Sequence, residues 1–191
     1  AHFQNHERHK KFLEDIASEI GRNDKSPFVR NFKEHYEGGE LPLYAAIELF
    51  SFGTLSKFYR NMKGADKKAI AQQYGVSYKY LESWIEHLAF VRNICAHYGR
   101  LYNAKFTKTP ILYDEYTKNK ISSLRVYATL LCLKHLLPRD EHWGKFVANL
   151  SLLIDDYPCV DIKLMGFPQK PVWGLYLVND MNTTHKIIKN K

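Results

Sequence analysis

The sequence predicts an all-α fold, and two observations support this prediction. Apolar residues recur at helical spacing along most of the chain, as in the stripe formed by Phe12, Ile16 and Ile20. Glycine and proline fall mainly between these periodic segments, where helices begin and end. The 191 residues contain no internal repeat and no obvious linker. We therefore expect residues 1–191 to form a single domain of about six or seven helices.

The first two helices are predicted from about His2 to Ile20 and from Pro27 to about Tyr36, because proline suits the first turn of a helix. Gly38 and Gly39 are expected to end the second one.

Three histidines, His2, His6 and His9, share one face of the first predicted helix. Helical histidines at this spacing can bind a metal ion, but no carboxylate or cysteine is placed to complete the ligand shell. We interpret these histidines as a solvated face, and we expect neither a metal site nor a cofactor.

Pro42 opens the next predicted helix, which runs from Leu43 to about Met62 and is unusually apolar. Gly53 lies within it, where a small residue permits close approach of a second helix. Glu48 is the one acid on its apolar face. Two interpretations remain open for Glu48: a buried carboxylate near the polar cluster described below, or a side chain that points to solvent.

A short helix over residues 67–74 is followed by Gly75 as a stop and Ser77 as a cap. The next helix is predicted from about Tyr78 to Tyr98. Its core stripe consists of Leu81, Trp84, Ile85, Leu88 and Val91.

Residues 68–81 also resemble a DNA-binding helix-turn-helix, with Ala71, Gly75 and Val76 at the small and turn positions. The second helix is long and carries a core stripe, whereas a recognition helix is usually short and polar. DNA binding therefore remains an alternative, and it requires the residues at the start of the second helix to be exposed, namely Ser77, Tyr78, Lys79 and Tyr80.

The rest of the chain is predicted to contain a loop over 100–116, a buried helix over 119–137, and a helix from Asp140 to about Asp155. The segment 158–178 is rich in proline and glycine, so we expect an irregular C-terminal tail. Phe167 and Trp173 are among its residues expected to pack back on the helices.

Charge and cysteine content limit the partners and the compartment. A formal net charge of +8 favours a polyanionic partner, with nucleic acid ahead of an acidic membrane surface. Cys95, Cys132 and Cys159 lack CxxC spacing and are typical of reduced thiols in a cytoplasmic protein. No apolar run approaches the roughly 18 residues of a membrane span, so no membrane partner is expected. The chain starts at Ala1 within a helical pattern, and we expect an N-terminal portion to be missing.

A polar cluster follows the core stripe of the 78–98 helix and contains Arg92, Asn93 and His97. Successive helical residues are about 100° apart, so Asn93 and His97 share a face, whereas Arg92 and His97 diverge by about 140°. Either the helix unwinds near Gly99, or two copies of the cluster meet across a two-fold interface.

Such a composite groove suits RNA cleavage. Histidine can act as base or acid near neutral pH, and arginine can hold a phosphate through paired N–H groups. Tyr98, Tyr102 and Asn103 could stack on or hydrogen-bond exposed bases. The alternative is a structural role, in which Arg92 pairs with Glu48 or Glu86 and His97 only completes the helix end.

Two longer segments resemble the Abi-like (AbiD/AbiF) abortive-infection proteins of bacteria. They are residues 92–103, RNICAHYGRLYN, and residues 41–59, LPLYAAIELFSFGTLSKFY. The similarity spans most of the region from Phe28 to Asn103. Abi-like proteins are similar to the HEPN superfamily, which is marked by an arginine, four to six intervening residues and then a histidine, often with a polar residue after the arginine. Arg92, Asn93 and His97 match this mark.

This resemblance implies a HEPN-like helical bundle that dimerises with its motifs facing each other. It also implies a metal-independent endoribonuclease that leaves a cyclic phosphate and acts as a phage-defence toxin, restrained by a small RNA or protein antitoxin. The residues that would act in catalysis are Arg92, Asn93 and His97, with Glu48 and Arg100 in possible support. The residues expected to bind RNA are Lys57, Arg60, Tyr98, Tyr102 and Asn103.

Some HEPN proteins only bind RNA or a partner. A non-catalytic RNA-binding module of a defence system is therefore a second hypothesis. It would depend on basic residues such as Lys57, Arg60 and Lys63, and not on His97.

Overall fold

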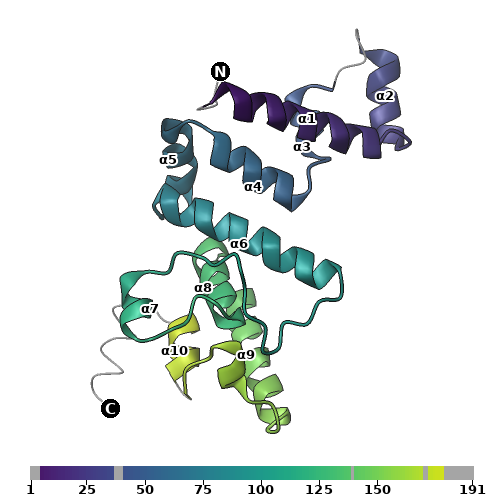
Figure 1. Ribbon diagram of the computed structural model, residues 1–191. Coiled ribbons are helices and arrows are strands. Elements are labelled where there is room, and N and C mark those ends of the chain that lie inside the picture. The colour runs from purple at the N-terminus through teal and green to yellow at the C-terminus, as the bar shows by residue number, and fades with distance from the viewer. Residues whose placement is uncertain (1–4, 37–40, 139, 170–171, 179–191) are drawn as a thin grey trace. The chain divides into compact units, whose positions relative to one another are not determined.

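The computed structural model describes residues 5–36, 41–138, 140–169 and 172–178, and every regular element among them is a helix (Figure 1). The predicted all-α class is confirmed. The helices are α1 (His6–Arg22), α2 (Pro27–His35), α3 (Leu43–Ile47), α4 (Phe52–Asn61), α5 (Gly64–Gln73), α6 (Tyr78–Ala96), α7 (Asp114–Lys118), α8 (Val126–Leu136), α9 (Glu141–Asp156), the 3₁₀ helix η2 (Ile162–Met165) and α10 (Val172–Val178).

The chain divides into two compact units, unit 1 (Ala1–Gln73) and unit 2 (Tyr74–Lys191). The single domain over residues 1–191 stays a prediction. In the part of the chain that the structure describes, no helix combines the length and apolar character needed to cross a lipid bilayer.

Unit 1 is built on the packing of α1 against α4. The Phe12 ring is buried and stacks on Phe58 with their centroids 5.2 Å apart, and it meets Phe50 edge to face at 5.9 Å. The buried carboxylate of Glu19 on α1 accepts a hydrogen bond of 2.7 Å from the Thr54 hydroxyl on α4. These contacts fix which faces of the two helices meet.

The single helix predicted from Leu43 to Met62 is wrong, because the structure has α3 and α4 with a break between them. Ser51 explains the break. Its backbone is extended, and its Oγ accepts a hydrogen bond of 3.1 Å from the Thr54 amide, so it caps a new helix. Glu48 lies at the C-cap of α3 and is exposed, as in the solvent-facing interpretation. The expectation that Gly38 and Gly39 end α2 lies outside the described residues.

Unit 2 packs α6 against α8, and α10 against both α8 and α9. Its core is strongly aromatic, and the buried side chains include Tyr116, Tyr127, Trp143, Trp173 and Tyr176. The Tyr127 hydroxyl donates to the Trp173 carbonyl at 2.7 Å, and the Trp143 indole donates to the Leu177 carbonyl at 3.0 Å. Phe167 and Trp173 are buried, which confirms that the C-terminal segment packs on the helices.

The start of α8 and the C-terminal segment of unit 2 differ from the predictions. The helix predicted over 119–137 starts only at Val126, because Arg125 is extended and the Leu124 carbonyl accepts a hydrogen bond of 2.9 Å from the distant Phe106 amide. The C-terminal segment contains η2 and α10, so it is only partly irregular. Contacts with distant residues explain both differences: the Phe106–Leu124 hydrogen bond before α8, and the burial of Phe167 and Trp173 in the C-terminal segment.

Candidate functional site

Helix α6 changes character along its length. Leu81, Trp84, His87 and Val91 are buried in its first part, as the predicted stripe requires for its apolar members. From residue 92 to residue 100, every side chain is exposed except that of Ile94, which is half-buried. The polar cluster therefore lies on a helix end that is held by the core but is itself open.

The loop that follows the cluster is attached to α6. The Trp84 indole donates to the Ile111 carbonyl at 2.7 Å, and the Ile111 amide donates to Ser83 Oγ, also at 2.7 Å. The Lys108 ammonium contacts the Glu86 carboxylate at 2.6 Å. These contacts hold residues 108–111 of the loop against α6.

His87 provides the innermost of these attachments. Its Nδ1 lies 2.7 Å from the Lys108 carbonyl, which can only accept, so Nδ1 carries the proton. Its Nε2 then accepts from the Thr129 hydroxyl at 2.9 Å. Burial lowers the pKa of His87 below its ordinary value, and the hydrogen bond to Lys108 opposes this shift. His87 therefore joins the loop to α6 and α8 as a neutral imidazole.

The end of α6 has the hydrogen bonds of a Schellman motif. The Tyr98 amide donates to the Cys95 carbonyl at 3.1 Å, and the Gly99 amide donates to the Ile94 carbonyl at 2.7 Å. Tyr98, with φ of 55°, occupies the left-handed position that glycine usually takes. Gly99 is needed for a different reason, since a Cβ there would lie 2.5 Å from Ile94 Cγ2. The helix thus ends two residues earlier than predicted.

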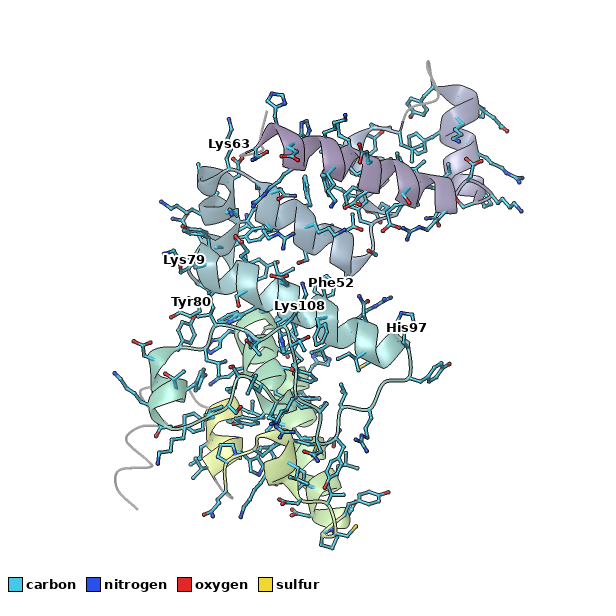
Figure 2. The ribbon with its side chains drawn as sticks, in the orientation of Figure 1. Phe52, Lys63, Lys79, Tyr80, His97 and Lys108 are labelled. Atoms are coloured by element: carbon cyan, nitrogen blue, oxygen red, sulfur yellow. The ribbon has the colours of Figure 1, made fainter. Side chains whose placement is uncertain are left out.

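Arg92, Asn93 and His97 are exposed on this helix end, and Figure 2 shows His97 at the C-terminal end of α6. Arg92 Nη1 donates to Asn93 Oδ1 at 3.2 Å. Within the described ranges, neither Arg92 nor His97 has a carboxylate partner. A guanidinium and an imidazole therefore face solvent at the same helix end.

The backbone geometry shows how Arg92 and His97 are placed on one helix end. The His97 amide still donates to the Asn93 carbonyl at 3.1 Å, so the helical path continues up to His97. Regular helical geometry ends at Ala96, and His97 is the C-cap, with φ of −101° and ψ of 23°. On regular helical spacing the side chains of Arg92 and His97 would diverge by about 140° around the helix axis.

The other residues predicted for this site differ in exposure and in their hydrogen bonds. The Tyr98 side chain is 99% exposed, which leaves both faces of its ring open. Tyr102 and Arg100 are also exposed. Asn103 is engaged, because its Oδ1 accepts a hydrogen bond of 2.9 Å from Arg125, and Arg125 also donates to the Ala104 carbonyl. Asn103 therefore helps to hold the loop.

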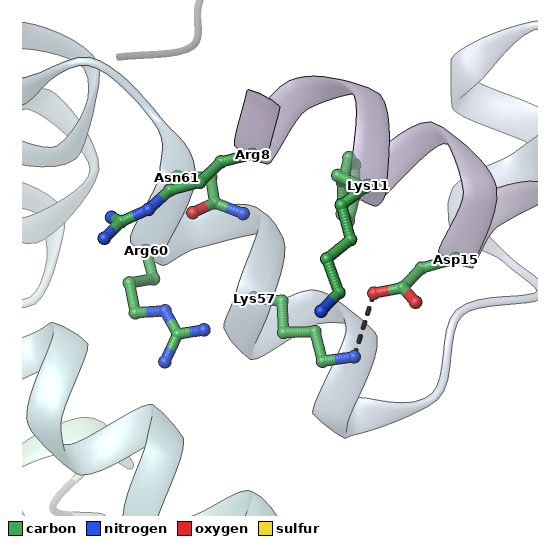
Figure 3. Close-up of a pocket in the computed structure, with 7 residues that line it drawn as sticks. Arg8, Lys11, Asp15, Lys57, Arg60 and Asn61 are labelled. Carbon is green, nitrogen blue, oxygen red and sulfur yellow. Dashed lines mark hydrogen bonds and ion pairs between the residues drawn. The ribbon is translucent and has the colours of Figure 1, made fainter. Parts of the chain in front are cut away.

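Lys57 and Arg60 belong to unit 1, as Glu48 does, and so lie on the other unit from the polar cluster. Both line a cleft between α1 and α4, together with Arg8 and Lys11 of α1 (Figure 3). Sequence reasoning missed the contribution of α1. The available signal was the spacing of Arg8 and Lys11, three residues apart on one helix face.

The segment that resembles a helix-turn-helix is divided between the units, since α5 belongs to unit 1 and α6 to unit 2. Lys79 is exposed, but Tyr80 is half-buried, with its ring centroid 4.5 Å from that of Tyr113 and 5.7 Å from that of Trp84 (Figure 2). The Tyr80 side chain is thus committed in part to the interior of unit 2.

Among the described residues, no three or more histidine, cysteine or acidic side chains lie together so that they could hold a metal ion. His2 lies outside them. The three cysteines are free thiols, with Cys132 buried and Cys95 and Cys159 exposed.

Comparison with protein families gives a match to the model of the Abi-like protein family over residues 1–103. The match covers more than half of the chain, and it includes all of unit 1, α6 and the polar cluster. The chain belongs to the Abi-like protein family. Membership in this family suggests a part in abortive infection, a form of defence against phages. No curated protein and no solved structure matches the chain. The segment after Asn103 lies beyond the family match.

Proposed function

We propose that this Abi-like protein is a metal-independent endoribonuclease of the HEPN type, with Arg92, Asn93 and His97 as its site. One observation carries the proposal: Arg92 and His97 are exposed on one helix end and have no carboxylate partner in the described part of the chain. The structural role considered for Arg92 would require such a partner. Glu86, one of the two predicted partners of Arg92, contacts Lys108.

The chemistry assigns each side chain a task. One imidazole removes the proton of the ribose 2′-hydroxyl, and the 2′-oxygen attacks the adjacent phosphorus. The bond to the 5′-oxygen breaks, that oxygen takes a proton from a second imidazole, and a 2′,3′-cyclic phosphate remains. Arg92 neutralises the charge that develops on the phosphoryl oxygens. Asn93 holds the Arg92 guanidinium through the observed 3.2 Å hydrogen bond.

The divergence of Arg92 and His97 supports a homodimer as the active form. One helix end cannot direct both groups at the same phosphate, whereas two ends related by a two-fold axis supply two arginines and two histidines. The exposed ring of Tyr98 would stack on a base beside the scissile bond. Arg100 would add positive charge at the mouth of the shared groove.

The test is cleavage of a diverse single-stranded RNA pool by the purified protein in EDTA, with the product ends analysed for cyclic phosphate. We expect His97→Ala and Arg92→Ala each to lower the cleavage rate by about 10²- to 10⁴-fold. Because both side chains are exposed, melting temperature and dimerisation should stay near those of the wild type. A wild-type dimer that leaves the pool uncut would refute the metal-independent nuclease.

A non-catalytic RNA-binding role is the second candidate, and the full exposure of Tyr98 favours it as much as it favours the nuclease. In that case His97→Ala would leave the biological effect unchanged, and substitutions of Tyr98 would remove it. The DNA-binding alternative receives no such support, since Tyr80 is packed against Tyr113.

A further inference from the structure

Unit 1 contains a cleft between α1 and α4 with a volume of about 450 Å³ (Figure 3). Four of its lining side chains are cationic, namely Arg8 and Lys11 from α1 and Lys57 and Arg60 from α4. Among the described residues, Asp15 is the only carboxylate that lines it. The cleft therefore carries a clear excess of positive charge.

The single carboxylate does not neutralise the cleft. Asp15 Oδ2 lies 2.8 Å from Lys57 Nζ, so it is committed to that one lysine. Arg8 and Lys11 have no ion-pair partner among the described residues. Figure 3 shows the ammonium groups of Lys11 and Lys57 near each other, with the Arg60 guanidinium further along α4. Cations that line the same cleft repel each other unless an anion lies between them.

A second observation concerns Asn61, the last residue of α4. It lines the cleft although its side chain is only 9% exposed, and in the described part of the chain its amide has no hydrogen-bond partner. Its amide atoms open into the cleft, since Asn61 is not among the described side chains whose fully buried polar atoms lack a partner. An amide directed into a basic cleft can donate to a phosphate oxygen while the cations balance the charge.

We propose that the α1–α4 cleft binds phosphate groups of a single-stranded polynucleotide. Lys11 and Arg8 supply the charge, and Asn61 donates an N–H to a phosphoryl oxygen. The volume is that of a site for one nucleotide, so the same chemistry would accept a free nucleotide. The choice of RNA as the ligand rests on the proposed function, while the phosphate site itself does not.

The experiment measures binding of a fluorescent single-stranded RNA of about 20 nucleotides by anisotropy, at several salt concentrations. All variants are made in a His97→Ala background, so that cleavage does not interfere. We expect Lys11→Gln to weaken binding by about 3- to 10-fold and to lower the salt slope by about 0.7, the value for one lost phosphate contact on a single strand. Asn61→Asp should weaken it by at least about 10-fold, because a carboxylate then faces the phosphate.

Lys10→Gln is the matched control. Lys10 is the neighbour of Lys11 on α1, is exposed and does not line the cleft. The Lys10→Gln substitution removes the same charge from a different face of α1. The RNA affinity of this variant should stay within about twofold of that of the His97→Ala parent. Thermal melting checks that each variant folds. Parallel titrations with ATP and inorganic phosphate separate a polynucleotide ligand from a free one.

The outcomes are distinct. If ATP or phosphate binding depends on Lys11 while RNA binding does not, the phosphate site stands and its occupant is a free nucleotide. If Lys11→Gln and Asn61→Asp bind RNA, ATP and phosphate as Lys10→Gln does, the proposal is overturned. If the wild type cuts no RNA but binds it through Lys11, the nuclease proposal fails and the cleft remains a phosphate site.

Discussion

His87 and His97 lie on the same helix and have opposite environments. His87 is fully buried, with Nδ1 bonded to the Lys108 carbonyl and Nε2 bonded to the Thr129 hydroxyl. His97 is exposed at the end of α6, and no hydrogen bond of its ring is found among the described residues. His87 stabilises the fold of unit 2, whereas His97 is accessible to a ligand. Substitutions of the two histidines should therefore have different effects on stability.

The largest change in stability is expected for His87→Ala. It leaves the Lys108 carbonyl and the Thr129 hydroxyl without their partner and opens a cavity, so the free energy of unfolding should fall by about 3 kcal/mol. Urea unfolding followed by circular dichroism measures this. His97→Ala is the control and should unfold as the wild type does. Equal stability of the two variants would show that His87 is not a structural group.

The pH dependence of stability gives a second, smaller effect of the burial of His87. Burial lowers the pKa of His87 in the folded protein below its ordinary value near 6.5, so below that pH the unfolded chain binds more protons. Stability due to this group is complete above about pH 6.5 and is lost as the pH falls toward the folded pKa, with a slope of at most about 1.4 kcal/mol per pH unit.

The measurement compares urea unfolding of the wild type and of His87→Gln at pH values of about 7.5, 6.5 and 5.5. The difference between the two proteins should shrink as the pH falls, because the variant lacks the titrating group. A difference that is constant over this range would mean that His87 does not couple to folding.

The smallest change in stability is expected for Tyr98→Gly. Glycine relieves the left-handed backbone of residue 98, worth about 1 kcal/mol, but it also loses more conformational entropy on folding. The two effects nearly cancel, so the free energy of unfolding should change by less than about 0.5 kcal/mol. RNA affinity should fall by about 1–3 kcal/mol if the Tyr98 ring stacks on a base. Unchanged affinity would exclude Tyr98 from the RNA-binding surface.

Local sequence patterns predicted several helices well. Periodicity with a cap residue placed α2 at Pro27 and α9 after Asp140. It failed where a local or distant contact overrides the pattern. Ser51 divides the 43–62 segment because its hydroxyl caps a new helix, and the hydrogen bond from Phe106 to Leu124 keeps the residues before α8 out of the helix.

The polar cluster and the family resemblance located the candidate site in the sequence. The contacts that surround the site could not be predicted in this way. Whether Arg92 pairs with Glu86 depends on Lys108, which approaches from a loop that has no periodic signal. His87 was overlooked because a histidine within an apolar stripe gives no sign of which carbonyl it will meet. The α1–α4 cleft was missed since Arg8 and Lys57 come together only in the folded unit.

The contacts of Lys108 and Ile111 with Ser83, Trp84 and Glu86 have a consequence for regulation. Because the loop after α6 is bonded to the same helix, this part of the site has its conformation before any nucleotide binds. An activating signal would therefore have little loop to order. In the proposed nuclease, control would then act on the encounter between copies. Specific activity would rise with protein concentration around the dissociation constant of the dimer, and an inhibitor would need only to keep two copies apart.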